Sequence, residues 1–212
     1  MNAVVFSLIT TFLDEPVMWL FAPIGLVLLL VVLRPRQPGA RGEAAVARRL
    51  RRYCDDVAND LIIRDGRGGL TQIDHLALTS HGLLVVETKD FGGLVFGQAH
   101  DQTWTQCIGT DRHKFENPLR QNYGHVKAVQ AIVPGVPVSG LVVFTDRAQF
   151  PNGLPEGATT LSQLPLALPL TSAESICIGH RDAWDVVLSH VLTDRLSRQA
   201  HLVLARRRKL GG

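Results

Sequence analysis

The chain contains few cysteines, and they are scattered. Cys54, Cys107 and Cys177 are the only three in 212 residues, and no two of them form a C-x-x-C pair. An odd number of widely spaced thiols argues against a disulfide framework and against a structural zinc site. The sequence also lacks internal repeats and low-complexity tracts. We therefore expect one main globular core with short additions, in a reducing compartment.

Charge is nearly balanced in total but is distributed unevenly. The 22 Lys and Arg residues exceed the 19 Asp and Glu residues by three, and the sequence pI is about 9.0. One basic cluster runs from Arg34 to Arg52, and a second spans Arg206 to Lys209. Such clusters suit phosphate backbones or anionic lipid headgroups, and a plain solvated surface explains them equally well.

Residues 16–33 form an apolar stretch without a charged side chain. As a helix they would span roughly 27 Å, just enough to cross a bilayer. Arginines follow the stretch and none precedes it, so the positive-inside rule places the rest of the chain in the cytoplasm. A cleaved signal peptide is the alternative, but no Lys or Arg lies in the first 15 residues and no clear A-x-A site follows. We predict a single-pass anchor in the cytoplasmic membrane.

The chain divides into three parts on this basis. Residues 1–38 comprise the anchor and a linker rich in Pro and Gly, which oppose regular structure. Residues 39–150 are expected to form the main globular domain. Residues 151–212 are expected to form a C-terminal extension with a basic helix, and the prolines and apolar residues of 151–179 have no assigned role.

Residue patterns within these parts predict a mixture of helices and strands. Apolar residues at helical spacing predict a helix over 43–57 that carries Glu43 on its apolar face. Short β-like runs separated by Gly-rich turns follow this helix. The full set of later elements comprises strands at 61–64, 71–78, 83–89 and 138–145, a helix at 117–132 and a long or broken helix at 181–208.

Asp74, Glu87 and Lys89 are the candidate catalytic residues. Glu87 and Lys89 are two residues apart, so they leave the same face of a strand about 6.6 Å apart. A hairpin would bring Asp74 beside Glu87. Two carboxylates at the end of an apolar hairpin are costly to bury unless a divalent cation lies between them. Asp74 and Glu87 therefore predict a site for a hard ion, Mg²⁺ or Mn²⁺.

Such a site would suit phosphodiester hydrolysis. With a metal polarising the scissile phosphate, Lys89 would orient the attacking water or neutralise charge developing on phosphorus. Glu43 would hold the ion through water or activate the nucleophile. By spacing alone, an ordinary salt bridge at the end of a strand explains the three residues as well.

Five longer stretches resemble the NERD (nuclease-related) domain, which is one of the PD-(D/E)xK restriction-endonuclease-like nucleases. They follow the order of that family and together cover about half of the chain. They are GEAAVARRL from Gly42, NDLII from Asn59, TQIDHLALTSHGLLVVETKDFGG from Thr71, WTQ from Trp104 and FENPLRQNYGHV from Phe115.

The resemblance implies a fold, a reaction and a set of site residues. The fold is a restriction-endonuclease-like α/β core, with a central mixed sheet flanked by helices, here preceded by one transmembrane helix. The reaction is hydrolysis of nucleic acid, with DNA as the expected substrate and Mg²⁺ or Mn²⁺ as the cofactor. The implied roles are metal binding for Asp74 and Glu87, catalysis for Lys89, support for Glu43 and Gln121, and a weaker part for Gln72.

Four further residues of these stretches are interpreted as structural. Asn117 before Pro118 is expected to cap a helix, and Trp104 is expected in the core. His75 should lie on the strand face opposite Asp74, and His125 one helical turn beyond Gln121. A catalytically silent nucleic-acid-binding or membrane scaffold protein with the same fold is the alternative function.

Overall fold

The computed structural model describes residues 39–168 and 177–192. These residues belong to one compact unit, Pro38–Gly212, which contains three hydrophobic clusters of its own. No helix within them is long and apolar enough to cross a membrane. The predicted membrane segment, residues 16–33, lies outside the described residues.

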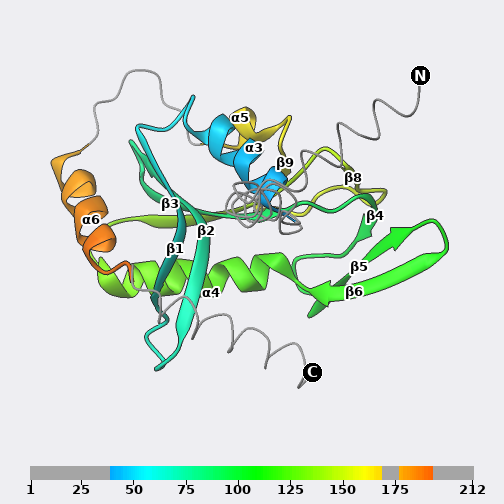
Figure 1. The fold of residues 1–212 in the computed structure, drawn as a ribbon, viewed down its shortest axis with the longest axis horizontal. Coiled ribbons are helices and arrows are strands. Elements are labelled where there is room, and N and C mark those ends of the chain that lie inside the picture. The colour runs from blue at the N-terminus through cyan, green and yellow to red at the C-terminus, as the bar shows by residue number, and fades with distance from the viewer. Residues whose placement is uncertain (1–38, 169–176, 193–212) are drawn as a thin grey trace, which may run out of the picture. The chain divides into compact units, whose positions relative to one another are not determined.

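A five-stranded sheet in the order β1-β2-β3-β7-β9 forms the centre of the fold (Figure 1). Its first three strands, β1 (Asp56–Arg64), β2 (Leu70–Thr79) and β3 (Gly82–Lys89), pair antiparallel in sequence order. Strand β7 (Val138–Phe144) pairs parallel with β3, and β9 (Ala158–Thr160) pairs parallel with β7. The sheet is mixed, as predicted.

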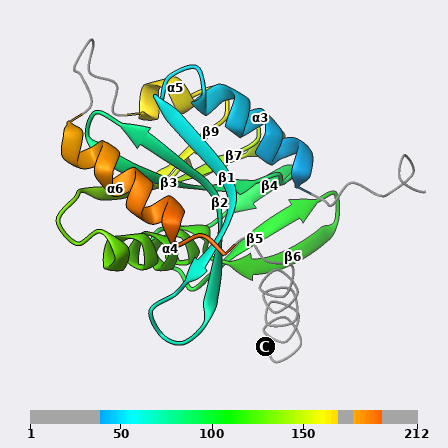
Figure 2. The same cartoon turned by 60° about the vertical axis from the view of Figure 1, so that its left-hand side comes forward.

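Helices cover both faces of this sheet (Figure 2). Helices α3 (Ala40–Leu50) and α5 (Leu164–Ala167) pack on one face, and α4 (Pro118–Ile132) and α6 (Ile178–Ser189) pack on the other. The result is a three-layer α/β/α arrangement, which confirms the predicted α/β class. Helices α5 and α6, like β9, come from the part of the chain beyond residue 150 and contribute to the same core.

Strand β3 contributes side chains to two hydrophobic clusters, one on each face of the sheet. Leu83 and Val85 lie in the cluster beneath α4 and α6, whereas Leu84 and Val86 lie in the cluster beneath α3 and α5. Successive side chains of a strand point to opposite faces, so a run of apolar residues suits a strand that is buried on both sides. Glu87 and Lys89 continue the series of Leu83 and Val85, so they lie on the face of the sheet that carries α4.

A second sheet of four strands, which the sequence did not predict, adjoins the first. Its order is β6-β5-β4-β8, and its β5–β6 hairpin projects from the body of the domain (Figure 1). Trp104 of β5 is fully buried, as predicted, and stacks on Phe144 of β7 with ring centroids 5.9 Å apart. The four strands are β4 (Gly93–Phe96), β5 (Thr103–Ile108), β6 (Asp111–Glu116) and β8 (Ala148–Gln149).

Two predicted helices have different limits in the structure. The helix predicted over 43–57 ends at Leu50, because the backbone N–H groups of Tyr53 and Cys54 both turn back to the Leu50 carbonyl. Val57, which fits the helical spacing, instead belongs to β1, where it pairs with Ala77. The helix predicted over 181–208 is α6, which starts earlier and ends at Ser189, and residues 193–208 lie outside the described residues.

Candidate active site

Asp74 and Glu87 are cross-strand neighbours on β2 and β3. The last pair of this ladder is His75 with Val86, so the next position sets Asp74 beside Glu87 on the face that carries α4. The backbone N–H of Thr88 donates a hydrogen bond of 2.8 Å to Asp74 Oδ2. The hairpin therefore juxtaposes the two carboxylates, as the spacing predicts.

His75 lies on the opposite face of the sheet, as expected. Its two ring nitrogens are 2.7 Å from Asn59 Oδ1 and 2.9 Å from Thr88 Oγ1. Burial lowers the pKa of His75 to about 4. A neutral, buried imidazole with both nitrogens bonded locks β1, β2 and β3 together behind the two carboxylates.

Lys89 links β3 to helix α4. Its Nζ donates to Glu87 Oε1 at 2.6 Å and to Gln121 Oε1 at 2.9 Å. Three of the predicted site residues are thus in direct contact. Glu87 is only 4% exposed and Lys89 is 16% exposed, so the ion pair is largely shielded from water and its mutual attraction is strong.

Helix α4 supplies a second contact to Glu87 through His125. Its Nε2 lies 3.4 Å from Glu87 Oε2, and its Nδ1 lies 2.7 Å from Thr71 Oγ1. Gln121 and His125 are one turn apart and therefore share the inner face of α4. Together with Lys89, His125 gives each carboxylate oxygen of Glu87 a partner.

The start of α4 is fixed by Asn117, which is fully buried. Its Oδ1 accepts from the backbone N–H of Leu119, which confirms the predicted helix cap, and Pro118 takes the first helical position. The Asn117 amide also donates to the carbonyls of Ala99 and Asp101 at 3.0 and 2.7 Å. One side chain thereby ties the loop after β4 to the helix that carries Gln121 and fixes that helix beside β3.

Helix α3 brings Glu43 to the site because Gly42 has no side chain. A Cβ atom at Gly42 would lie 2.7 Å from Cβ of Asp90, which directly follows β3. Only glycine lets the first turn of α3 approach this closely without a shift. Burial and repulsion from Asp60 and Glu87 raise the pKa of Glu43. Glu43 therefore shares the electrostatic environment of the two strand carboxylates.

The carboxylates differ in how their charge is compensated. Burial and repulsion from Glu87 and Glu43 outweigh the Thr88 hydrogen bond and raise the pKa of Asp74 to about 7. Burial acts to raise the pKa of Glu87 as well, but its contacts with His125 and Lys89 hold that pKa below the usual range. The site therefore carries more negative charge than its own cations neutralise.

This imbalance is what a hard divalent cation would correct. Asp74, Glu87 and Glu43 offer carboxylate oxygens, which Mg²⁺ and Mn²⁺ prefer. Within the described residues, no three His, Cys, Asp or Glu side chains converge into a complete metal site. The donor set fits an ion that takes two protein carboxylates and fills its other positions with water or substrate oxygen.

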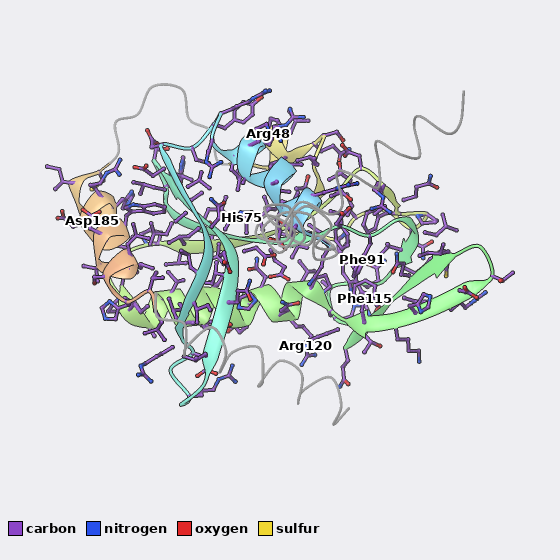
Figure 3. The ribbon with its side chains drawn as sticks, in the orientation of Figure 1. Arg48, His75, Phe91, Phe115, Arg120 and Asp185 are labelled. Carbon is purple, nitrogen blue, oxygen red and sulfur yellow. The ribbon has the colours of Figure 1, made fainter. Side chains whose placement is uncertain are left out.

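Two contacts of this site exceed what the sequence suggested. The sequence predicts a structural role for His125 and none for Thr71, whereas the two form a chain of contacts that ends on Glu87. The four-residue spacing between Gln121 and His125 was the available signal. Gln72, the weaker candidate, donates from its Nε2 to Asp60 Oδ1 at 3.0 Å. Figure 3 labels His75 on the central sheet, behind the two carboxylates.

Comparison with known proteins identifies a family for this part of the chain. The model of a family described as nuclease-related domain (NERD) matches residues 38–145, about half of the chain. An uncharacterized protein of Bacillus anthracis is 34% identical over 102 residues, which are 47% of this chain and 48% of that protein. The chain thus spans about half the length of this curated relative. No solved structure matches.

Proposed function

We propose that this chain, which belongs to the nuclease-related domain (NERD) family, is a metal-dependent nuclease that hydrolyses phosphodiester bonds of DNA. We further propose that residues 16–33 hold it at the cytoplasmic face of a membrane. The observation that supports nuclease chemistry most strongly is the contact of Lys89 with both Glu87 and Gln121, next to a second carboxylate on Asp74.

Asp74 and Glu87 would hold the metal, with Glu43 close enough to act on its shell of water. When bound, a divalent ion withdraws charge from phosphate oxygens and lowers the pKa of a coordinated water. The ion would also offset the burial and the repulsion from Glu87 and Glu43 that together raise the pKa of Asp74 to about 7. Thr88 keeps Asp74 in place through its backbone N–H, so the carboxylate is oriented before any ligand arrives.

Lys89 has the capacity to act on substrate as well. An ammonium group has three N–H donors, and two of them go to Glu87 and Gln121. The third can reach a phosphate oxygen or the attacking water. A fixed cation in a site of low water content stabilises charge that develops on phosphorus without needing to reorganise. Gln121 would serve by positioning Lys89.

Nucleic-acid binding without turnover remains the second candidate, and one feature favours it. Both oxygens of Glu87 have partners in Lys89 and His125, so Glu87 must release or share one of them to bind a metal. A protein in which this exchange does not occur would bind nucleic acid in a salt-dependent manner and leave it intact.

A cleavage assay separates these functions. Purified residues 39–212 should cut DNA in Mg²⁺ or Mn²⁺ and should be inactive in EDTA, and Lys89→Ala should be inactive under all conditions. Lys127→Ala is the matched control, because Lys127 is an exposed lysine of α4 that contacts Tyr123 and Gln130 instead of the site. Equal cutting by the Lys89→Ala protein would refute the mechanism, and metal-independent binding without cutting by the wild type would establish the second candidate.

A further inference from the structure

Helix α3 presents a line of arginines on its outer side. Arg41 and Arg48 are exposed, as is Arg52 in the turn just after the helix, whereas Val46 and Leu50 on the inner side are fully buried. The seven-residue interval between Arg41 and Arg48 places both on one side of α3, with a rise of roughly 10 Å along the axis, and Arg52 follows in the turn beyond the helix. Arg48 lies on the side of α3 turned away from the central sheet (Figure 3).

Nothing in the described part of the chain neutralises these arginines. Across residues 39–168 and 177–192, none of the three arginines takes part in an ion pair. Glu43, the one acidic residue of α3, is half-buried, and its pKa is raised by burial and by repulsion from Asp60 and Glu87. Asp56, close in sequence, is paired with Arg181 of α6.

Helix stability does not account for these arginines either. Cations are favourable near the C-terminal end of a helix, which suits Arg48 in the last turn of α3. Arg41 lies in the first turn, where the helix dipole opposes a cation. The helix dipole therefore gives no reason for a positive charge at Arg41.

We propose that the arginine face of α3, formed by Arg41, Arg48 and Arg52, binds anionic lipid headgroups. Guanidinium groups pair with phosphate in a bidentate manner, and exposed cations in one row can reach a planar array of headgroups together. Binding would fix how the domain, and with it the candidate active site, is oriented at a membrane surface.

The choice of lipid over nucleic acid rests on the membrane anchor proposed above. A span that ends at Leu33 leaves seven residues before Arg41, and the eight Cα-to-Cα steps from Leu33 to Arg41 reach at most roughly 29 Å when fully extended. Arg34 and Arg36 lie within this short connection. The face would therefore be tethered close to the headgroups of the leaflet that the positive-inside rule selects.

Vesicle binding tests this surface without the anchor. Residues 39–212, which carry all three core clusters, would be sedimented with vesicles of phosphatidylcholine alone or of equimolar phosphatidylserine and phosphatidylcholine. We expect binding only to the anionic vesicles. The triple variant Arg41→Ala, Arg48→Ala, Arg52→Ala should bind them on the order of 100-fold more weakly.

A control variant removes the same charge elsewhere. Arg67, Arg112 and Lys114 are exposed on the β1–β2 turn and the β5–β6 hairpin, and their replacement by alanine should have little effect on vesicle binding. Replacing the three α3 arginines by lysine should retain most of the binding. Equal losses in the α3 and control variants would show only a general charge effect, and no binding of the wild type to anionic vesicles would overturn the proposal directly.

Two further measurements keep this proposal separate from the nuclease proposal. Lys89→Ala should bind vesicles as the wild type does, whether or not the wild type cuts DNA. Retention of a labelled oligonucleotide in the absence of metal would be compared for the wild type and the α3 variant. An α3 variant that loses oligonucleotide binding and keeps vesicle binding would assign the face to the substrate, and the lipid proposal would be wrong.

Discussion

Lys89 Nζ lies 2.6 Å from Glu87 Oε1, although the two residues are only two positions apart on the same strand. The pair is nearly enclosed, and Gln121 on α4 holds the lysine from the other side at 2.9 Å. A surface ion pair of this kind would contribute little, but an enclosed one leaves an uncompensated charge when either member is removed. The contact is therefore a sensitive point for both stability and chemistry.

Removing the charge of Lys89 should separate these two roles. Lys89→Met should lower metal-free stability by about 3 kcal/mol, because Glu87 would be left buried without its cation. The double variant Glu87→Gln, Lys89→Met should recover most of that stability in urea titrations and remain inactive in DNA cleavage. Recovery of activity together with stability would contradict the catalytic role of the pair.

His125 should act on Glu87 rather than on substrate. Its ring contacts Glu87 Oε2 and Thr71 Oγ1, so His125→Ala would free one oxygen of Glu87 and loosen its orientation. We expect cleavage to fall by about 10- to 100-fold and the Mn²⁺ concentration for half-maximal activity to change. His113→Ala on the exposed strand β6 is the control and should leave both unchanged. Unchanged metal dependence in His125→Ala would reduce His125 to a packing role.

Asp74 should make metal-free stability depend on pH. Its pKa rises from 3.8 to about 7 on folding, so the folded protein keeps a proton that the unfolded chain releases between these values. The stabilisation is complete below pH 3.8 and is lost as the pH rises through about 7. Asp74→Asn should therefore raise the melting temperature relative to wild type at pH 8 and have much less effect at pH 4. Equal changes in melting temperature at both pH values would show that folding does not raise the pKa of Asp74.

A substitution at Gly42 tests how helix α3 positions Glu43. Gly42→Ala would place a Cβ atom 2.7 Å from Cβ of Asp90, so the first turn of α3 must move, at a cost of roughly 1 to 3 kcal/mol. Cleavage should fall as far as it does in Glu43→Gln. Gly124→Ala is the same change at an open position of α4 and should be neutral or stabilising by up to about 1 kcal/mol in thermal unfolding. Full activity in Gly42→Ala would show that Glu43 has no part in the site.

The sequence could predict those contacts of the site that depend on the alternation of side chains along a strand. Alternation on β3 sets Glu87 and Lys89 on one face, and the turn at Gly82 fixes the register that brings Asp74 beside Glu87. The contact of Gln121 with Lys89 needs the long-range packing of α4 on β3, which spacing alone does not specify. The resemblance to a family implied a supporting role for Gln121 and did not specify this contact.

The second sheet was not predicted because its strands lack a recognisable sequence pattern. Five of the six residues of β6 are exposed, so the strand lacks the alternation of apolar and polar residues that marks a half-buried strand. Strands β8 and β9 are two and three residues long, too short for any period to be recognised. The helix predicted over 43–57 was too long because Val57 fits the helical spacing. In the structure, strand pairing with Ala77 determines the position of Val57.

A single crystallographic measurement tests the central claim most directly. Crystals of residues 39–212 would be soaked in Mn²⁺ at a concentration that supports cleavage, and an anomalous difference map would locate the ion. The proposed function predicts a peak between the carboxylates of Asp74 and Glu87, and the loss of that peak in the Asp74→Asn protein. A map with no peak at these two residues, from protein that cleaves DNA under the same conditions, would contradict it.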